Sequence, residues 1–227
     1  MRTLLILAVC CIAAHAEMRP IPVAQASTDG MLDPAAAAWK SVTPATVSLQ
    51  RTPLLFPTDQ PAALEIPSVE LRMVRSGGKM LARLEWADPS RETAAFAKAE
   101  RAWQGDHLVK QSEATDRFSD ACAIMTPAGP VGDVFPSLQM GDAEHPVHIY
   151  FWDSSRGAAV MEATGRQTTH RTGQSFPVKS NWAAAKWTVV FELPDLPPGS
   201  PVAVAIWNGK QQDRDGRKYF SIWYKTQ

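Results

Sequence analysis

The residues with the most evident chemistry lie in the stretch PSLQMGDAEHPVHIYFW, which runs from Pro136 to Trp152. Met140 offers a thioether directly before a glycine, and His145 and His148 offer imidazole nitrogens within the next eight residues. Thioether sulfur and imidazole nitrogen are both ligands of transition metals. The stretch therefore indicates either a metal site or a loop that happens to carry such ligands.

The two histidines fit a zinc site poorly. Residues three apart on a strand point to opposite faces, so His145 and His148 converge on one ion only where the strand bends. Zinc also needs further ligands, and the remaining candidates, His107 and His170, lie in polar, loop-like sequence. A zinc site is therefore the less favoured interpretation.

The elements that must position these residues are short strands. Apolar residues alternate on both sides of a Gly-Gly turn between residues 69 and 86, which predicts a β-hairpin. Further strands are expected at residues 119–125, 147–152, 158–163, 187–193, 202–207 and 219–224. The Ala-rich residues 93–103 form either a helix or an irregular insertion. This pattern predicts an all-β fold, an antiparallel β-sandwich with at most one or two short helices.

The chain divides into three segments. Residues 1–16, MRTLLILAVCCIAAHA, have an early Arg, an apolar run and an Ala-His-Ala ending, which is typical of a secretory signal peptide. The run is shorter than the roughly 20 residues that span a bilayer. Residues 17–64, rich in Pro and Ala, are expected to form an arm packed on the domain, which covers residues 65–227. We therefore expect an exported protein without a membrane span.

Charge and cysteine content exclude several partners and cofactors. The expected signal peptide contains one of the 23 basic residues, which leaves 22 against 23 acidic ones and no basic surface for nucleic acid. Cys122 is the one cysteine that follows it. This excludes an internal disulfide, an all-cysteine iron-sulfur site and a covalent c-type haem. Any redox centre must be held by other ligands.

The sequence lacks the motifs of common enzyme classes. It contains no G-x-S-x-G, no phosphate loop, no H-E-x-x-H and no G-x-G-x-x-G after a strand. Its acidic residues fall in turns and on polar strand faces, where solvated side chains are the rule. We therefore expect no catalysis by this chain alone.

Four stretches together resemble one family: LEWADPS, DRFSDACAIM, HPVHIYFWDSSRGAAVMEATGR and VAVAIWNGKQQDRDGRKYFSIWY. They are similar to the haem-b-binding gamma subunit of periplasmic molybdoenzymes, a group that includes ethylbenzene dehydrogenase, dimethylsulfide dehydrogenase, selenate reductase and chlorate reductase. The similarity runs from about residue 69 to the C-terminus. It implies a periplasmic β-sandwich that holds one non-covalent haem b and transfers electrons without acting on a substrate.

The resemblance also implies the axial ligands of the haem iron. The family's methionine stands before a glycine, ahead of a strand that ends in tryptophan, and corresponds to Met140. Its lysine follows Gly-Arg in a turn and corresponds to Lys218. Lys210 is the alternative, because it follows Trp207 by three residues. The aromatic residues that flank these ligands in sequence and are expected to line an apolar slot are Phe135, Tyr150, Trp152, Trp207 and Tyr219.

The chemistry of this ligand pair is consistent with a redox role. A thioether favours ferrous iron and so raises the reduction potential of a haem. Lysine binds iron only as the free amine, and burial lowers the pKa of a lysine by up to about 3 to 5 units. Both requirements favour partly buried positions for Met140 and Lys218.

The resemblance implies the partners as well: an alpha subunit with a molybdopterin cofactor, a beta subunit with iron-sulfur clusters and a soluble periplasmic cytochrome. Two other interpretations stay open. In the first, the chain is a carbohydrate-binding module of similar fold, in which Trp103 or Trp182 stacks on a sugar ring. In the second, it is a cytochrome b domain that works without a molybdoenzyme.

Overall fold

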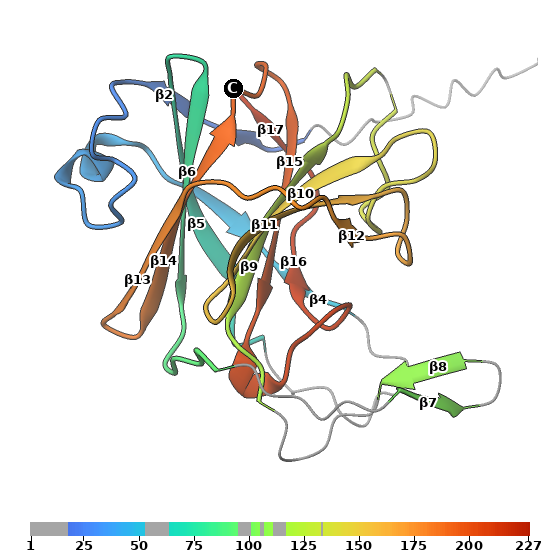
Figure 1. Ribbon diagram of the computed structural model, residues 1–227. Coiled ribbons are helices and arrows are strands. Elements are labelled where there is room, and N and C mark those ends of the chain that lie inside the picture. The colour runs from blue at the N-terminus through green and yellow to red at the C-terminus, as the bar shows by residue number, and fades with distance from the viewer. Residues whose placement is uncertain (1–17, 53–63, 95–100, 105–106, 111–116, 133) are drawn as a thin grey trace, which may run out of the picture.

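The computed structural model describes residues 18–52, 64–94, 101–104, 107–110, 117–132 and 134–227. These residues form two β-sheets that pack face to face, which confirms the predicted all-β sandwich (Figure 1). Short 3-10 helices lie at Ala37–Ser41 (η1) and Gly209–Gln211 (η3). Within the described part of the chain, no helix has the length and apolar character needed to cross a membrane.

The smaller sheet is built around the predicted hairpin. Its strands, in spatial order, are β13 (Val178–Ala183), β14 (Lys186–Pro194), β6 (Lys79–Ala87), β5 (Ser68–Ser76) and β2 (Val23–Gln25), and β3 (Ala45–Ser48) also pairs with β5. The turn between β5 and β6 holds Gly77 and Gly78 at φ +57° and +78°. Such backbone angles favour glycine, and they match the twist of a two-residue hairpin.

The larger sheet contains the strands that carry the candidate ligands. In spatial order these are β1 (Pro20–Ile21), β17 (Tyr224–Thr226), β15 (Pro201–Trp207), β9 (Ala121–Pro127), β10 (Val147–Asp153), β11 (Gly157–Ala163) and β12 (His170–Arg171). The short strand β16 (Tyr219–Phe220) pairs with β15 and with β4 (Gln50–Arg51). A separate hairpin is formed by β7 (Arg101–Gln104) and β8 (His107–Lys110).

Most predicted strands lie within two residues of their expected bounds, with three differences. Residues 219–224 form two strands because β16 pairs with the end of β15 and β17 with its beginning. Residues 101–103 lie in strand β7, so the helical alternative for 93–103 is wrong there, and residues 95–100 lie outside the described residues. Strand β13 was not predicted, because it is an edge strand whose side chains are mostly exposed and alternate little.

The N-terminal segment takes part in both sheets. Strands β2 and β3 join the smaller sheet, and β1 and β4 join the larger one. The expected signal peptide, residues 1–16, lies outside the described residues, as do residues 53–63. The division into an arm and a domain at residue 64 stays a prediction.

Both faces of the larger sheet are apolar. On β10 the inner face carries Tyr150 and Trp152, and Trp152 meets Trp187 of the other sheet edge to face, with ring centroids 5.1 Å apart. The outer face of the same strand carries Ile149 and Phe151. An antiparallel sheet ordinarily presents polar residues on the face that does not pack on the core. The outer face therefore forms a second apolar cluster, in which Ala123 and Ile149 are 2% and 4% exposed.

Candidate functional site

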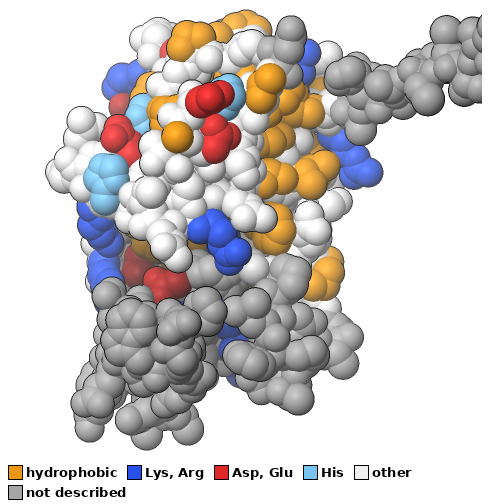
Figure 2. All heavy atoms as spheres, turned by 90° about the vertical axis from the view of Figure 1, so that its right-hand side faces the viewer, with side chains coloured by type: hydrophobic (Ala, Val, Ile, Leu, Met, Phe, Trp, Pro, Cys, Tyr) orange, Lys and Arg blue, Asp and Glu red, His pale blue; other side chains and the backbone are white. Residues whose placement is uncertain are grey.

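Small side chains occupy the middle of this outer face. They come from the adjacent strands β9 and β15 and form what we call the alanine floor: Ala121, Ala123, Ala203 and Ala205. Larger side chains border the floor in register on its four sides: Phe151, Phe220, Trp207 and Met125. Figure 2 looks onto this side of the molecule and shows hydrophobic side chains gathered in a band. A flat apolar floor with aromatic borders suits a planar aromatic ligand.

The loop before β10 holds Met140 against this face. The Met140 side chain is partly buried and packs on the outer apolar cluster. Its carbonyl accepts a hydrogen bond from the backbone N–H of Gly165 at 2.9 Å. Its backbone has φ +76°, an unusual value for a non-glycine residue. Strained backbone of this kind often occurs at functional sites, where the surrounding structure maintains it.

Gly141 explains why the loop can turn at this point. It has φ +73°, and its backbone N–H donates to the carbonyl of Ser137 at 2.8 Å. A Cβ at this position would lie 2.7 Å from the carbonyl oxygen of His145. Only glycine meets both conditions without strain. The Met-Gly pair noted in the sequence is thus a tight turn that directs the thioether onto the sheet.

Lys218 reaches the same place from the other end of the chain. It precedes β16, and its carbonyl accepts hydrogen bonds from the backbone N–H and the hydroxyl of Thr52 at 2.9 and 3.0 Å. Its Nζ lies 3.6 Å from Met140 Sδ and 5.2 Å from the ring centroid of Trp207. The structure therefore brings together the methionine and the lysine singled out in the sequence, although 78 residues separate them.

The surroundings of Lys218 favour its neutral form. Burial lowers the pKa of Lys218 to about 8, and the charge of Arg166 adds to the effect, while Asp215 opposes it. Among the described residues, no carboxylate lies within ion-pair distance of its amine. A lysine with this pKa is roughly one-tenth neutral at pH 7, far more than an exposed lysine. It can therefore supply a free amine as a ligand.

The other predicted site residues occupy different positions. Trp207 lies under the Lys218 amine and meets Phe151 edge to face at 5.3 Å between ring centroids. Phe135 is 39% exposed in the loop that leads to Met140. The alternative ligand Lys210 is exposed in η3, and among the described contacts none joins it to the thioether. Only Trp207 among these lies directly against the Met140–Lys218 pair.

Tyr150, Trp152 and Tyr219 point away from the pair. All three are buried in the core between the sheets, on the inner face of the larger sheet. The sequence interpretation missed Phe151, which borders the alanine floor. The period-2 alternation of β10 contains the signal, because a strand that places Tyr150 and Trp152 inside must place Phe151 outside.

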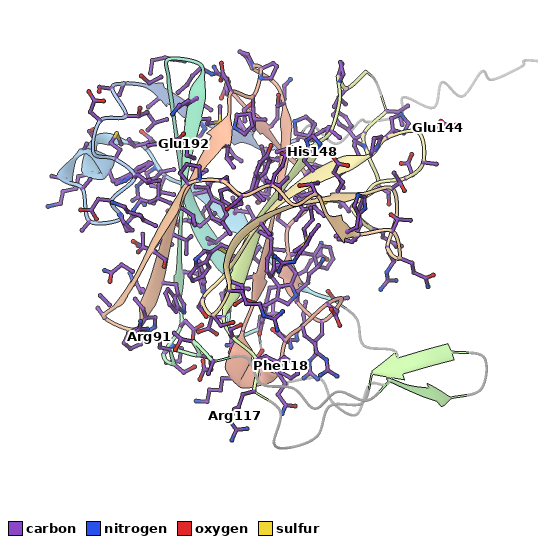
Figure 3. The ribbon with its side chains drawn as sticks, in the orientation of Figure 1. Arg91, Arg117, Phe118, Glu144, His148 and Glu192 are labelled. Atoms are coloured by element: carbon purple, nitrogen blue, oxygen red, sulfur yellow. The ribbon has the colours of Figure 1, made fainter. Side chains whose placement is uncertain are left out.

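The histidines have carboxylate partners. His145 Nδ1 lies 2.9 Å from Asp142, and His148 Nε2 lies 3.1 Å from Glu162. The described residues contain no group of three or more histidine, cysteine or acidic side chains arranged to hold a metal. His148 lies at the same end of the sandwich as Glu192 (Figure 3), and both line a cavity of about 550 Å³ that includes neither candidate ligand. The zinc interpretation gains no support.

The tryptophans named for sugar stacking give no exposed platform in the described part of the chain. Trp182 is partly buried, packs on the core and donates its indole N–H to the carbonyl of Asp88 at 3.1 Å. The side chain of Trp103 lies outside the described residues.

Comparison with known proteins agrees with the resemblance noted in the sequence. The family model described as ethylbenzene dehydrogenase matches residues 36–185, which is more than half of the chain. The chain belongs to the ethylbenzene dehydrogenase family. The match to this family includes Met140 and ends before Lys218. The position of Lys218 beside the thioether is thus an observation that the family match does not contain.

Three relatives extend the comparison. The chain is 27% identical over 203 residues to a protein of Haloferax mediterranei whose name describes a respiratory nitrate reductase heme subunit, and this covers 84% of the chain and 66% of the relative. It is 27% identical over 179 residues to dimethylsulfide dehydrogenase subunit gamma of Rhodovulum sulfidophilum, which covers 70% and 60%. It is 25% identical over 244 residues to chlorate reductase subunit gamma of Ideonella dechloratans, which covers 98% and 93%. The chain thus spans less than two thirds of the length of the first two relatives.

Proposed function

We propose that this protein holds one non-covalent haem b, with Met140 Sδ and Lys218 Nζ as axial ligands, and serves as a non-catalytic electron-transfer subunit of a molybdoenzyme. The observation that carries the proposal is the 3.6 Å contact between the thioether and the amine on an apolar sheet face. One relative is named as a heme subunit, and two are named as gamma subunits of a dehydrogenase and a reductase.

The donor pair fits an iron atom in chemistry and nearly in distance. Bonds from a first-row metal to sulfur and nitrogen are roughly 2.3 and 2.0 Å long, as in zinc sites. Met140 Sδ and Lys218 Nζ, which lie 3.6 Å apart, would have to separate slightly to hold one iron atom between them. The lowered pKa of Lys218 makes its free amine accessible at neutral pH.

The surface around the pair fits a porphyrin. The alanine floor has no side chain beyond Cβ, but Ala121, Ala123 and Ala203 are only 2–4% exposed, so a flat ring would reach the sheet only after the side chains that cover the floor move aside. Phe151 and Trp207 supply aromatic edges, and the methionines Met125 and Met161 add polarizable sulfur on the same face. When bound, the haem would supply a reversible one-electron couple, and the thioether of Met140 and the apolar surroundings would set its potential.

The proposed partners rest on the family resemblance, to which the names of two relatives add only that each is a gamma subunit. They are an alpha subunit with a molybdopterin cofactor and a beta subunit with iron-sulfur clusters. Electrons would pass between the beta subunit and a soluble periplasmic carrier. The secretory character of residues 1–16 supports a periplasmic location.

Absorption spectra of the purified chain test the proposal. The wild-type chain, produced with haem available, is expected to show a Soret band and a six-coordinate low-spin spectrum. Met140→Ala and Lys218→Ala are each expected to give a high-spin spectrum or to lose haem. Met161→Leu and Lys210→Ala serve as controls, and both should keep the low-spin spectrum. Met161 is a methionine on the same outer face as Met140, and Lys210 is a lysine in η3, before the loop that carries Lys218. A wild-type chain that binds no haem would contradict the proposal.

A further inference from the structure

Arg166 lies in a loop that is attached to the loop of Met140. This loop follows β11, and the N–H of Gly165 donates to the carbonyl of Met140 at 2.9 Å. The hydroxyl of Thr168 donates to the carbonyl of Gly165 at 2.8 Å and accepts from the N–H of Thr164 at 2.7 Å. These bonds close the loop on itself. The position of Arg166 is therefore tied to the position of one proposed ligand.

The guanidinium of Arg166 reaches the loop of the other proposed ligand. Its Nη2 lies 3.8 Å from the position that a Cβ would take on Gly216, two residues before Lys218. The charge of Arg166 also acts on the amine of Lys218, since it contributes to the lowered pKa of that lysine. Arg166 thus extends from the loop bound to Met140 to the loop that carries Lys218. A group held by both ligands would lie next to this guanidinium.

Arg166 has no anionic partner among the described residues. Its side chain is exposed, and no described carboxylate lies within ion-pair distance. Arginine ordinarily binds carboxylates through two parallel hydrogen bonds. The charge of Arg166 acts unfavourably on the protonated amine of Lys218, and an anion bound between the two would relieve this. The arrangement calls for a carboxylate supplied by a ligand.

We propose that Arg166 binds a propionate carboxylate of the haem held by Met140 and Lys218 and acts as a positioning residue for the cofactor. This inference rests on the proposed function. The porphyrin of haem b carries two propionates, and an arginine at the edge of the site would hold one of them while the apolar face receives the ring. Arg166 then decides the orientation and the retention of the haem.

A comparison of two cofactors tests this role. Haem and haem dimethyl ester, in which both propionates are esterified, are loaded into the wild type, Arg166→Gln, Arg166→Lys and Arg156→Gln, and their loss to apomyoglobin is timed. Arg156 is the matched control, because it is exposed in the turn at the other end of β11. Arg166→Gln is expected to lose haem roughly tenfold faster than the wild type. Arg166→Lys should lie between them, since lysine keeps the charge without the planar fork.

The dimethyl ester separates a contact with the propionate from a general effect on the fold. All four proteins are expected to release the ester at similar rates, because it has no carboxylate for Arg166 to bind. Equal haem loss from Arg166→Gln and Arg156→Gln would overturn the inference, as would equally accelerated loss of haem and ester from Arg166→Gln. In either case a low-spin wild-type spectrum leaves the proposed function standing. A wild type without haem would overturn both.

Discussion

The amine of Lys218 lies 3.6 Å from the sulfur of Met140, on the outer face of the larger sheet. A partly buried lysine normally has a carboxylate or a carbonyl as its nearest partner, because these accept its hydrogen bonds best. A thioether is only a weak acceptor, and it is instead a good ligand for soft or borderline metals. The contact therefore adds little as a hydrogen bond, and it is the arrangement that the proposed haem ligation requires.

The Met-Gly turn is expected to be sensitive to a single methyl group. Gly141→Ala introduces a Cβ only 2.7 Å from the carbonyl oxygen of His145, at a φ of +73°. We expect a loss of about 2 to 3 kcal/mol in the free energy of unfolding, together with weaker haem binding. Gly157→Ala is the control, since its φ is +78° but no atom lies within 4 Å of the added methyl. Gly157→Ala should lower the free energy of unfolding by about 1 kcal/mol. If urea denaturation gave the same loss for Gly141→Ala and Gly157→Ala, the clash with His145 would not be the cause.

The lowered pKa of Lys218 makes the stability of the haem-free protein depend on alkaline pH. Burial lowers this pKa from 10.5 to about 8 in the folded state. Between these two values the unfolded chain binds more protons than the folded one, so stability rises with pH. We expect the wild type to gain on the order of 2 kcal/mol over this range relative to Lys218→Met. Lys210→Met changes an exposed lysine and should show the same dependence of the free energy of unfolding on pH as the wild type. If the wild type and Lys218→Met instead gave parallel curves of this free energy against pH, the amine of Lys218 would be well solvated.

Two buried acids, Asp88 after the end of β6 and Asp120 before the start of β9, predict that stability falls as the pH rises. Burial, with repulsion from Asp120, raises the pKa of Asp88 to about 7. A carboxyl with a raised folded-state pKa binds more protons in the folded chain, so stability falls as the pH rises from about 4 to about 7. Its Oδ2 receives no hydrogen bond from a described residue. We expect Asp88→Asn to be more stable than the wild type at pH 8, by on the order of 1 kcal/mol in thermal or urea unfolding.

Asp120 provides the contrast for this prediction. Its carboxylate accepts hydrogen bonds from the N–H groups of Glu92 and Gly209 at 2.8 and 2.9 Å and from the indole of Trp187 at 2.9 Å. Only one of the two terminal atoms of an asparagine amide accepts hydrogen bonds, so Asp120→Asn should lower the free energy of unfolding by about 1 to 3 kcal/mol. If Asp88→Asn and Asp120→Asn changed the free energy of unfolding equally, the different hydrogen bonding of the two carboxylates would not determine their contribution to stability.

A buried ion pair supports the strand that follows Lys218. Arg51 pairs with Asp213, and its guanidinium lies 4.5 Å from the ring centroid of Tyr219. The two side chains are 8% and 0% exposed. Arg51→Met removes the nearer counter-ion of the buried Asp213 carboxylate and leaves Arg217 at 3.4 Å, so we expect a loss of about 3 kcal/mol in the free energy of unfolding, the low end for a broken buried pair.

The double variant Arg51→Met/Asp213→Asn tests the cause of that loss. The asparagine keeps an acceptor for the N–H of Asn208, which donates to Asp213 at 3.1 Å, and it removes the buried charge. Most of the stability should therefore return. If the double variant is as unstable as Arg51→Met alone, packing against Tyr219 rather than charge explains the effect.

Local patterns in the sequence were enough for the fold class and for most of the strands. The Gly77–Gly78 turn and the alternation on either side of it define a hairpin whatever the rest of the chain does, because turn geometry and the period of a strand are local properties. The resemblance, carried by contiguous stretches, named both proposed ligands and the haem.

The tertiary structure alone decided which face of each strand meets the core. On β10 both faces are apolar, so alternation separates Phe151 from Tyr150 and Trp152 without telling which set lies inside. The choice depends on the second sheet, which packs against one face only. For that reason three aromatic residues expected at the site lie in the core, namely Tyr150, Trp152 and Tyr219, while Phe151 borders the alanine floor.

The sequence by itself determined the all-β class, and with the family resemblance it singled out Met140 as a candidate ligand and two lysines as its candidate partners. Only the tertiary structure decided between Lys218 and Lys210 as neighbours of the thioether and placed Arg166 beside the site. The physical reason is distance along the chain. Met140 and Lys218 meet because β9, β10, β15 and β16 pair in one sheet, and such long-range pairing depends on how the whole chain buries its apolar surface.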